Sequence, residues 1–483
     1  MSIFLEISFI SKKMAQKKIF QFTGFCKEFK GRNTVHDYGN EVIDMGNITY
    51  TLDTVPLRRF HKKIFAYTLG GTFMDGYIIG TLSLGLPFIV TEMNMSVFWQ
   101  GLIGSSALIG ILIGAPICGW LSDKIGRQII YLWHFIILVV AAALQFFVQS
   151  PETLFLLRLI LGFSIGAEYV VGPTMLAEFV PLKYRATMCS AMIAAWYVGN
   201  FVAFAICYLI KDLGPDNWRW MLVSAVVPGI LVLFLRAGSP ESLRWLIKKG
   251  KIDKAREIVV KFLGPDVSIE GFVEEARSGQ KKVSFFQIFG KKLWKRTLFG
   301  SIFYASQVLV FYAVFTFLPT VLSTLNVNNA YFGSVIVNFI SLVGGVIGLL
   351  VVDRFKRREF IIATFILFGS PLVILGIFLH LPGVVVTVLF CMAMAFLAMG
   401  QTLQFVYPPE MFPTELRSSG VGFVTAFSRV GAATGTFLLP VMLSTVGVSA
   451  AILMIAGVAG IGLLASIFFA PETRGKSLED TLE

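Results

Sequence analysis

The sequence predicts an all-α membrane protein with twelve transmembrane helices arranged in two six-helix bundles. Of the 483 residues, 56% are hydrophobic and only 14% are charged, whereas soluble domains have roughly 25% charged residues. The apolar residues gather in twelve runs of about 20 residues, the length of a helix that crosses a bilayer. Three local motifs also occur twice at almost the same spacing, which indicates a duplicated unit.

The apolar runs follow one another through short connections, with one exception. Residues 237–296 form a polar, Lys-rich segment that divides the runs six and six. We therefore expect a polar N-terminal segment (1–64), a first bundle (65–236), a cytoplasmic linker (237–296), a second bundle (297–470) and a cytoplasmic tail (471–483). In chain order the runs lie near 66–90, 99–121, 129–148, 153–177, 187–210, 218–236, 297–323, 330–352, 360–380, 382–406, 418–444 and 448–470.

Basic residues collect in alternate connections between the runs. They include Lys124 and Arg127, Lys183 and Arg185, the linker, and the cluster at 354–358. Because loops rich in Lys and Arg stay in the cytoplasm, we expect a multi-pass protein of the plasma membrane with both termini cytoplasmic. The cytoplasmic position of these loops then accounts for the formal charge of +12. No nucleic-acid partner is needed to explain it, and none is expected.

The remaining sequence gives no sign of a chemical centre. The N-terminal segment shows no structure before Asp53, and Met14 and Met45 are alternative starts. Its apolar patch at 3–10 is too short for a secretory signal peptide. The His and Cys residues lack metal-ligand spacing, and no phosphate-binding loop is present. We expect no metal, no cofactor, no catalytic residue and no enzymatic activity.

An internal repeat relates the two halves of the chain. Gly119-Trp-Leu-Ser-Asp123 and the Asp353 region are 230 residues apart, measured between the aspartates. The pattern Glu-x-x-Pro-x-x-x-Arg occurs at 178–185 and at 410–417, and Pro-Glu-Ser/Thr occurs at 240–242 and at 471–473, with offsets of 232 and 231. An even number of crossings in each copy gives parallel repeats around a central cleft, which suits alternating access.

From about Asp53 to Glu479 the chain resembles the major facilitator superfamily. The stretch from Gly119 to Arg127 looks like its signature between helices two and three, and the segments at 240–246 and 471–478 look like its sugar-transporter-type motifs. Residues 52–61 and 73–77 are similar to those of metabolite:proton symporters and organic ion carriers. Sugar porters are a more distant fit, because Asp75 precedes Gly76-Tyr77 here. The resemblance implies the major facilitator fold and a secondary active transporter.

Charged residues inside the apolar runs are the first candidates for function. A charge at the bilayer centre costs at least about 2.5–3.5 kcal/mol, so it needs a partner or a water-filled cavity. Asp75, Arg158 and Glu168 are the candidates for proton coupling, with Asp75 as the carrier. The alternative for Asp75 is a static clamp with Arg158 that holds two helices together. For Glu168 the alternative is a helix-packing polar network.

Arg429 is the candidate for substrate binding. It resembles a position where organic anion carriers hold arginine, and a guanidinium suits the bidentate capture of a carboxylate. The alternative is that Arg429 only pairs with an acid. Polar or amphipathic side chains at mid-helix positions are the further candidates, and helix-to-helix hydrogen bonding is their alternative. They are Tyr77, Trp196, Tyr197, Asn200, Gln307, Tyr312, Asn338, Gln401 and Gln404.

The loop motifs suggest gating rather than binding. Asp123 is expected to pair with Arg127 or Arg185, and Gly119 to let a neighbouring helix approach. The alternative is that these charges only set the topology. The complete gating set is Gly119, Asp123, Arg127, Glu178, Arg185, Glu241, Arg244, Asp353, Glu410, Arg417 and Glu472.

The sequence favours a proton-coupled carrier of a small polar organic solute, with an anionic metabolite or carboxylate preferred. A sugar:proton symporter is the first alternative, supported by the sugar-transporter-type motifs. A transporter-like receptor that binds solute without moving it is the second. The expected partners are the solute, protons and membrane lipid, and the protein is expected to be a monomer.

Overall fold

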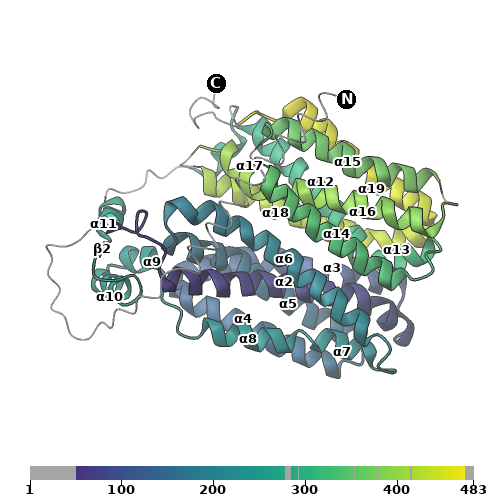
Figure 1. The fold of residues 1–483 in the computed structure, drawn as a ribbon, viewed down its shortest axis with the longest axis horizontal. Helices are drawn as coiled ribbons and strands as arrows, with labels where there is room; N and C mark the ends of the chain where they lie inside the picture. The colour runs from purple at the N-terminus through teal and green to yellow at the C-terminus, as the bar shows by residue number, and fades with distance from the viewer. Residues whose placement is uncertain are drawn as a thin grey trace, which may run out of the picture.

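The computed structural model describes residues 50–277, 284–291, 293–352, 354–378, 380–413 and 416–473. Within these residues, 12 helices are long and apolar enough to cross a membrane. The predicted all-α fold with twelve transmembrane helices is thereby confirmed. Figure 1 shows two bundles lying side by side, the first in purple to teal and the second in green to yellow.

The first bundle holds six spans in sequence order, and its last span is broken at residues 224–225. Within it α2 packs along α6, and α3 packs along α5. The elements are α2 (Arg59–Glu92), α3 (Val97–Ile125), α4 (Arg127–Leu144) with the short η2 (Gln145–Phe147), α5 (Pro151–Phe179), α6 (Leu182–Ile210), α7 (Asn217–Val223) and α8 (Val226–Arg236).

The second bundle repeats this arrangement. Its first span packs along its fifth, α12 along α18, and its second along its fourth, α14 along α16. The bundles meet where α3 contacts α18 and α6 contacts α14. The elements are α12 (Trp294–Thr316), α13 (Leu318–Thr324), α14 (Ala330–Val351), α15 (Arg357–Ile377), α16 (Gly383–Gln401), α17 (Leu403–Met411), α18 (Arg417–Thr445) and α19 (Gly447–Phe469).

The linker is folded, whereas its polar, Lys-rich sequence predicts only a connecting segment. It forms α9 (Leu243–Lys248), α10 (Ile252–Phe262), β2 (Val267–Ser268), α11 (Glu270–Arg277) and η3 (Phe285–Phe289). Strand β1 (Tyr50–Thr51) pairs in parallel with β2, although no structure was expected before Asp53. Leu52 is only 1% exposed and joins a core of linker and first-bundle side chains. We call this end, at the left in Figure 1, the linker end.

At the opposite end, which we call the distal end, side chains join the two bundles. Ser83 Oγ of α2 donates to the carbonyl oxygen of Phe315 of α12 at 2.8 Å. The rings of Phe88 and Tyr331 stack at 5.4 Å between centroids, and Phe98 meets Phe437 of α18 at 5.7 Å. The bundles are therefore in direct contact at the distal end.

Candidate functional site

Asp75 lies halfway along α2 and is completely buried, at 0% exposure. Neither of its carboxylate oxygens has a hydrogen-bond partner among the described residues. The ionisable groups that act on it electrostatically are Glu168, Arg236 and Arg429. Asp75 is thus a buried acid, free of any direct ion pair, between charges of the first bundle and an arginine of the second.

Glu168 of α5 is held in a buried ion pair with Arg236, the last residue of α8. Arg236 Nη2 donates to Glu168 Oε1 at 2.8 Å, and Nη1 lies 2.8 Å from Oε2. His134 Nε2 of α4 lies 3.2 Å from Oε2. The ion pair therefore joins α4, α5 and α8 inside the first bundle, and it supplies the polar network that was the alternative for Glu168.

Arg236 makes further contacts that fix its position. Its guanidinium donates to the backbone oxygens of Tyr67 and Tyr131 at 3.2 and 3.3 Å, and it lies 3.9 Å from the centre of the Tyr131 ring. Sequence reasoning missed this residue because it ends an apolar run, where arginines are usually interfacial. No signal in the sequence distinguishes it from such an arginine.

Arg158 does not form the clamp with Asp75 that was considered from the sequence. It is 1% exposed, and its Nη1 donates to the backbone oxygen of Ile78 at 3.1 Å. Ile78 and Asp75 both lie on α2, one helical turn apart. The Arg158 guanidinium therefore contacts the helix that carries Asp75, but at the backbone of the next turn and not at the carboxylate. In the described structure Arg158 has no ion pair with a carboxylate.

Arg429 of α18 faces the first bundle across the interface. Its guanidinium carbon lies 5.0 Å from the ring centre of Tyr169 of α5, and Tyr312 of α12 and Tyr304 are among the groups that act on it electrostatically. Arg429 is 8% exposed, and its Nε has no partner among the described groups. A buried guanidinium between aromatic rings, with a donor unused, can accept an anion.

Most of the other predicted binding residues also lie at this interface. The Tyr197 hydroxyl donates to Gln401 Oε1 across the two bundles, and Gln404 Nε2 donates to Gln307 Oε1 at 2.9 Å. Asn200 Nδ2 donates to the backbone oxygen of Gly76 at 3.1 Å, beside Asp75.

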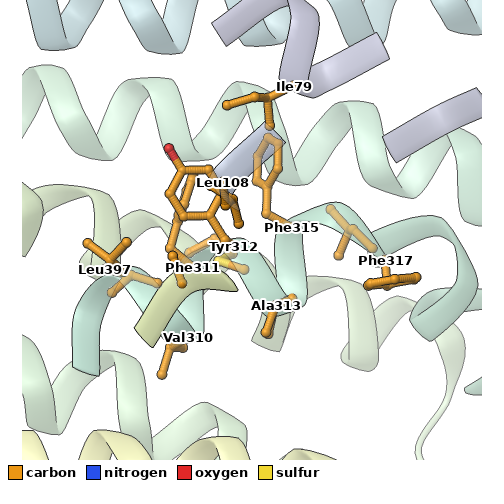
Figure 2. Close-up of a cluster of buried hydrophobic side chains, with 14 of the residues drawn as sticks. Ile79, Leu108, Val310, Phe311, Tyr312, Ala313, Phe315, Phe317 and Leu397 are labelled. Carbon is orange, nitrogen blue, oxygen red and sulfur yellow. The ribbon is translucent and has the colours of Figure 1, made fainter. Parts of the chain in front are cut away.

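Aromatic side chains complete the interface. The Trp196 ring meets Phe311 and Tyr312 edge-on, at 5.5 and 6.3 Å between centroids. In Figure 2, Phe311, Tyr312 and Phe315 project from α12, and Ile79 of the first bundle lies over Phe315. A solute bound here would be in contact with aromatic rings from both bundles.

Two predicted binding residues point elsewhere. The Tyr77 hydroxyl lies 2.9 Å from Ser224 Oγ, inside the first bundle. Asn338 Nδ2 donates to the backbone oxygen of Ser334 on its own helix, at 2.8 Å. We define the central polar cluster as Asp75, Trp196, Tyr197, Asn200, Gln307, Tyr312, Gln401, Gln404 and Arg429.

Several atoms of the central polar cluster lack partners in the part of the chain that the structure describes. Besides both oxygens of Asp75, they are Trp196 Nε1, Asn200 Oδ1, Gln307 Nε2 and Arg429 Nε. Buried polar atoms in proteins are almost always hydrogen-bonded, so this concentration marks a place for a polar ligand or water. The described residues contain no group of three or more His, Cys, Asp or Glu side chains that could hold a metal ion.

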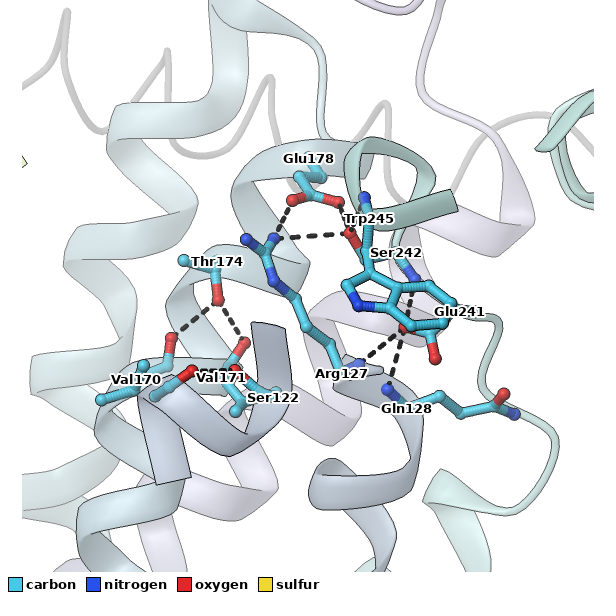
Figure 3. Close-up of polar contacts among 11 residues, drawn as sticks. Ser122, Arg127, Gln128, Val170, Val171, Thr174, Glu178, Glu241, Ser242 and Trp245 are labelled. Carbon is cyan, nitrogen blue, oxygen red and sulfur yellow. Dashed lines mark hydrogen bonds and ion pairs between the residues drawn. The ribbon is translucent and has the colours of Figure 1, made fainter. Parts of the chain in front are cut away.

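At the linker end, three of the predicted gating residues, Arg127, Glu178 and Glu241, belong to one network (Figure 3). Glu241 Oε1 accepts from the backbone N–H groups of Arg127 and Gln128 at 2.8 and 3.1 Å. Arg127 pairs with Glu178, and Ser242 Oγ donates to Glu178 Oε2 at 2.5 Å. The network ties α4 and α5 to the start of the linker.

The second bundle has the same network with equivalent residues. Glu472 accepts from the backbone N–H groups of Arg357 and Arg358 at 3.1 and 3.2 Å. The Arg357 guanidinium lies 3.2 Å from Glu410, and Thr473 Oγ1 donates to Glu410 Oε2 at 2.6 Å. The repeat inferred from the sequence is therefore also a repeat of contacts.

Other gating residues are placed differently from the expectation. Asp123 pairs with neither Arg127 nor Arg185; Arg185 instead bonds Asp53 at 2.7 Å, and the Asp123 backbone oxygen accepts from Trp245 Nε1 at 3.0 Å. The reason is that Arg127 is already paired with Glu178, and the folded segment before α2 places Asp53 beside Arg185.

Four members of the gating set remain to be placed, namely Gly119, Arg244, Arg417 and Asp353. A Cβ at Gly119 would lie 3.4 Å from Val170 Cγ1, an ordinary contact, so this glycine is not where the helices approach most closely. Arg244 lies 5.0 Å from the ring centre of Phe272. Arg417 begins α18, and Asp353 lies outside the described residues.

Comparison with known proteins shows extensive similarity to transporters. A family model described as "Sugar (and other) transporter" matches residues 23–483. The inner membrane metabolite transport protein YgcS of Escherichia coli K12 is 36% identical over 427 residues, which cover 88% of this chain and 95% of YgcS. A D-xylose transporter of Levilactobacillus brevis is 28% identical over 441 residues, covering 86% and 94%. The inward open structure of the xylose transporter XylE from E. coli has the same fold, with a TM-score of 0.75 at 22% identity over 87% of this chain and 99% of XylE.

Proposed function

The chain belongs to the family of sugar (and other) transporters within the major facilitator superfamily, and from this premise we propose that it moves a small anionic organic solute together with a proton. A carboxylate is the favoured anionic group. The protein is a multi-pass membrane transporter and not an enzyme. The proposal concerns which solute class it carries and how transport is driven.

The observation that carries the proton-coupling proposal is the state of Asp75. Its carboxyl group is buried, and both oxygens lack partners in the described structure. A carboxyl group in this position can take up or release a proton without breaking a direct ion pair. Isolated acids within the membrane are characteristic of proton pathways.

The electrostatic neighbours of Asp75 fit such a role. Glu168 is matched by Arg236, so this pair adds little net charge near Asp75. Arg158 has no carboxylate partner in the described state. A movement of α2 along α5 would let its guanidinium leave the Ile78 backbone oxygen and pair with the Asp75 carboxylate. We propose that this exchange accompanies the rocking of the bundles.

Arg429 supplies the anion-binding group in the proposal. Its positive charge acts on Asp75 electrostatically. An anion bound at Arg429 would offset that charge and favour protonation of Asp75, and protonation of Asp75 would in turn favour the anion. This is the coupling that symport requires, because each ligand must stabilise the binding of the other. The amides and aromatic rings of the central polar cluster would hold the rest of the solute.

The proposed orientation places the linker end in the cytoplasm, with both termini. The support is the positive-inside rule, since the Lys- and Arg-rich connections lie at that end. The gating networks at the linker end would then open and close the cytoplasmic side, and the distal contacts would close the outer side. We propose that one chain, surrounded by lipid and without nucleic acid, is the transporting unit.

The test replaces Asp75 with Asn in protein reconstituted into vesicles. We expect the variant to lose proton-driven accumulation but to keep counterflow exchange, because only the proton-binding step is removed. Asp212→Asn, in an exposed connection, is the matched control and should leave both activities intact. Undiminished accumulation by Asp75→Asn would remove Asp75 from the coupling role.

A sugar:proton symporter is the second candidate, supported by Gln307, Gln401, Gln404 and Asn200. Neutral amides of this kind suit a ligand rich in hydroxyl groups. Competition of labelled hexose uptake against benzoate or nicotinate separates the candidates. Saturable hexose uptake that resists both acids would replace the proposal of an anionic solute.

A further inference from the structure

A short segment at the linker end has exposed aromatic rings outside the membrane-spanning helices. It comprises η3, the described residues Gly290, Lys291 and Leu293, and the first residues of α12. Phe286 is 76% exposed, and Phe285, Phe289 and Trp294 are also exposed. We define these four aromatic residues, with Lys291 and Lys295, as the interfacial patch.

The segment is held rigidly against the second bundle. Ile288 and Leu293 are buried with Leu416, which precedes α18. Thr297 Oγ1 donates to the Ile288 backbone oxygen at 2.7 Å, and Phe289 packs against Phe423 of α18 at 5.0 Å. Because its inner side is fixed, the outer side presents Phe286 in a defined position.

The charge of the segment has one sign. From residue 276 to residue 352 the sequence contains no Asp or Glu. Arg296 is directed inward, since its Nη1 donates to the Met411 backbone oxygen at 3.0 Å. Lys291 and Lys295 are exposed, so their ammonium groups are available to an external anion.

Position and composition together specify the partner. The patch surrounds the start of α12 at Trp294, where the membrane-spanning helix begins, and it therefore lies at the level of the lipid headgroups. Aromatic rings bind at that level, and lysines beside them attract anionic headgroups. We propose that the interfacial patch binds the headgroup of an anionic phospholipid and so anchors α12 and α18 to the bilayer surface.

The test measures lipid binding directly, so it does not depend on the transported solute. Purified full-length protein is taken from vesicles of phosphatidylcholine mixed with phosphatidylglycerol, and the retained lipids are counted by native mass spectrometry. We expect wild-type protein to retain phosphatidylglycerol in preference to phosphatidylcholine. Lys291→Gln with Lys295→Gln should weaken this preference by about five-fold per lysine, the usual effect of one basic residue at an anionic membrane.

The matched control removes two other exposed lysines, Lys254 and Lys261 of α10, by the same substitution to Gln. It should retain phosphatidylglycerol as the wild type does. A second variant, Phe286→Ser, should reduce the retention of both lipids while leaving the melting temperature unchanged, since the ring is exposed. Equal losses in the α10 control, or full retention by the Lys291 and Lys295 variant, would overturn the proposal.

Discussion

Glu241 and Glu472 perform the same task in the two bundles. Each carboxylate accepts hydrogen bonds from the first two backbone N–H groups of a membrane helix, α4 for Glu241 and α15 for Glu472. The first N–H groups of a helix have no partner within the helix, and the helix dipole favours a negative charge there. In both bundles, therefore, an acid from a distant part of the chain caps the N-terminus of a membrane helix.

Replacing Glu241 or Glu472 with Ala should lower the melting temperature of the purified protein by similar amounts. Loss of a helix cap costs about 0.5–2 kcal/mol. Gly126, which has a positive φ of 111°, lies so close to the Glu241 carboxylate that a Cβ there would overlap Oε2. Glu257→Ala on the exposed side of α10 is the control. An unchanged melting temperature in either variant would mean that the acid does not stabilise its helix.

Gly71 faces the buried ion pair, and its substitution tests how much that pair contributes to stability. A Cβ at Gly71 would lie 2.0 Å from Arg236 Nη2 and 2.1 Å from Glu168 Oε1. Both groups are immobilised by further contacts, so Gly71→Ala should separate them. Disruption of a buried pair costs about 3–5 kcal/mol, and we expect a lower yield and melting temperature. Gly457→Ala, where nothing lies within 4 Å, should have no such effect, and equal melting temperatures would contradict the prediction.

The sequence predicts the fold well because its signals are local. The length of each span and the repeat can be read without knowing which helices are neighbours. The same holds for charges inside apolar runs, and these charges identify Asp75 and Arg429. The choice of partners cannot be read in this way. Arg236 rather than Arg158 pairs with an acid, and Asp53 rather than Asp123 pairs with Arg185, because packing of distant segments decides both. The strand at Tyr50 likewise depends on a partner more than 200 residues away.

Arg429→Lys should separate the role of a charge from that of a guanidinium. Lysine keeps the positive charge but cannot form two parallel hydrogen bonds to a carboxylate. The loss of one charge-assisted hydrogen bond, about 1.5–3 kcal/mol, should raise the KM for an anionic solute roughly tenfold or more. Arg256→Lys on the exposed α10 is the control. If the KM is unchanged, the solute does not contact Arg429 through two hydrogen bonds.

Gly101 lies near the start of α3, where the bundles meet at the distal end. A Cβ there would lie 2.3 Å from the backbone oxygen of Phe437 of α18, and backbone cannot move aside as a side chain can. Gly101→Leu should therefore keep the bundles apart at the distal end and stop transport.

The separation of the bundles can be measured at Ser83, which is buried where the two bundles touch. A cysteine placed there by Ser83→Cys should react faster with an impermeant thiol reagent in protein that also carries Gly101→Leu than in protein that does not. Gly457→Leu, whose position has open space around it, should leave both transport and labelling unchanged. Normal transport by Gly101→Leu, with slow labelling of the cysteine, would show that close contact between α3 and α18 is not needed to close the distal end.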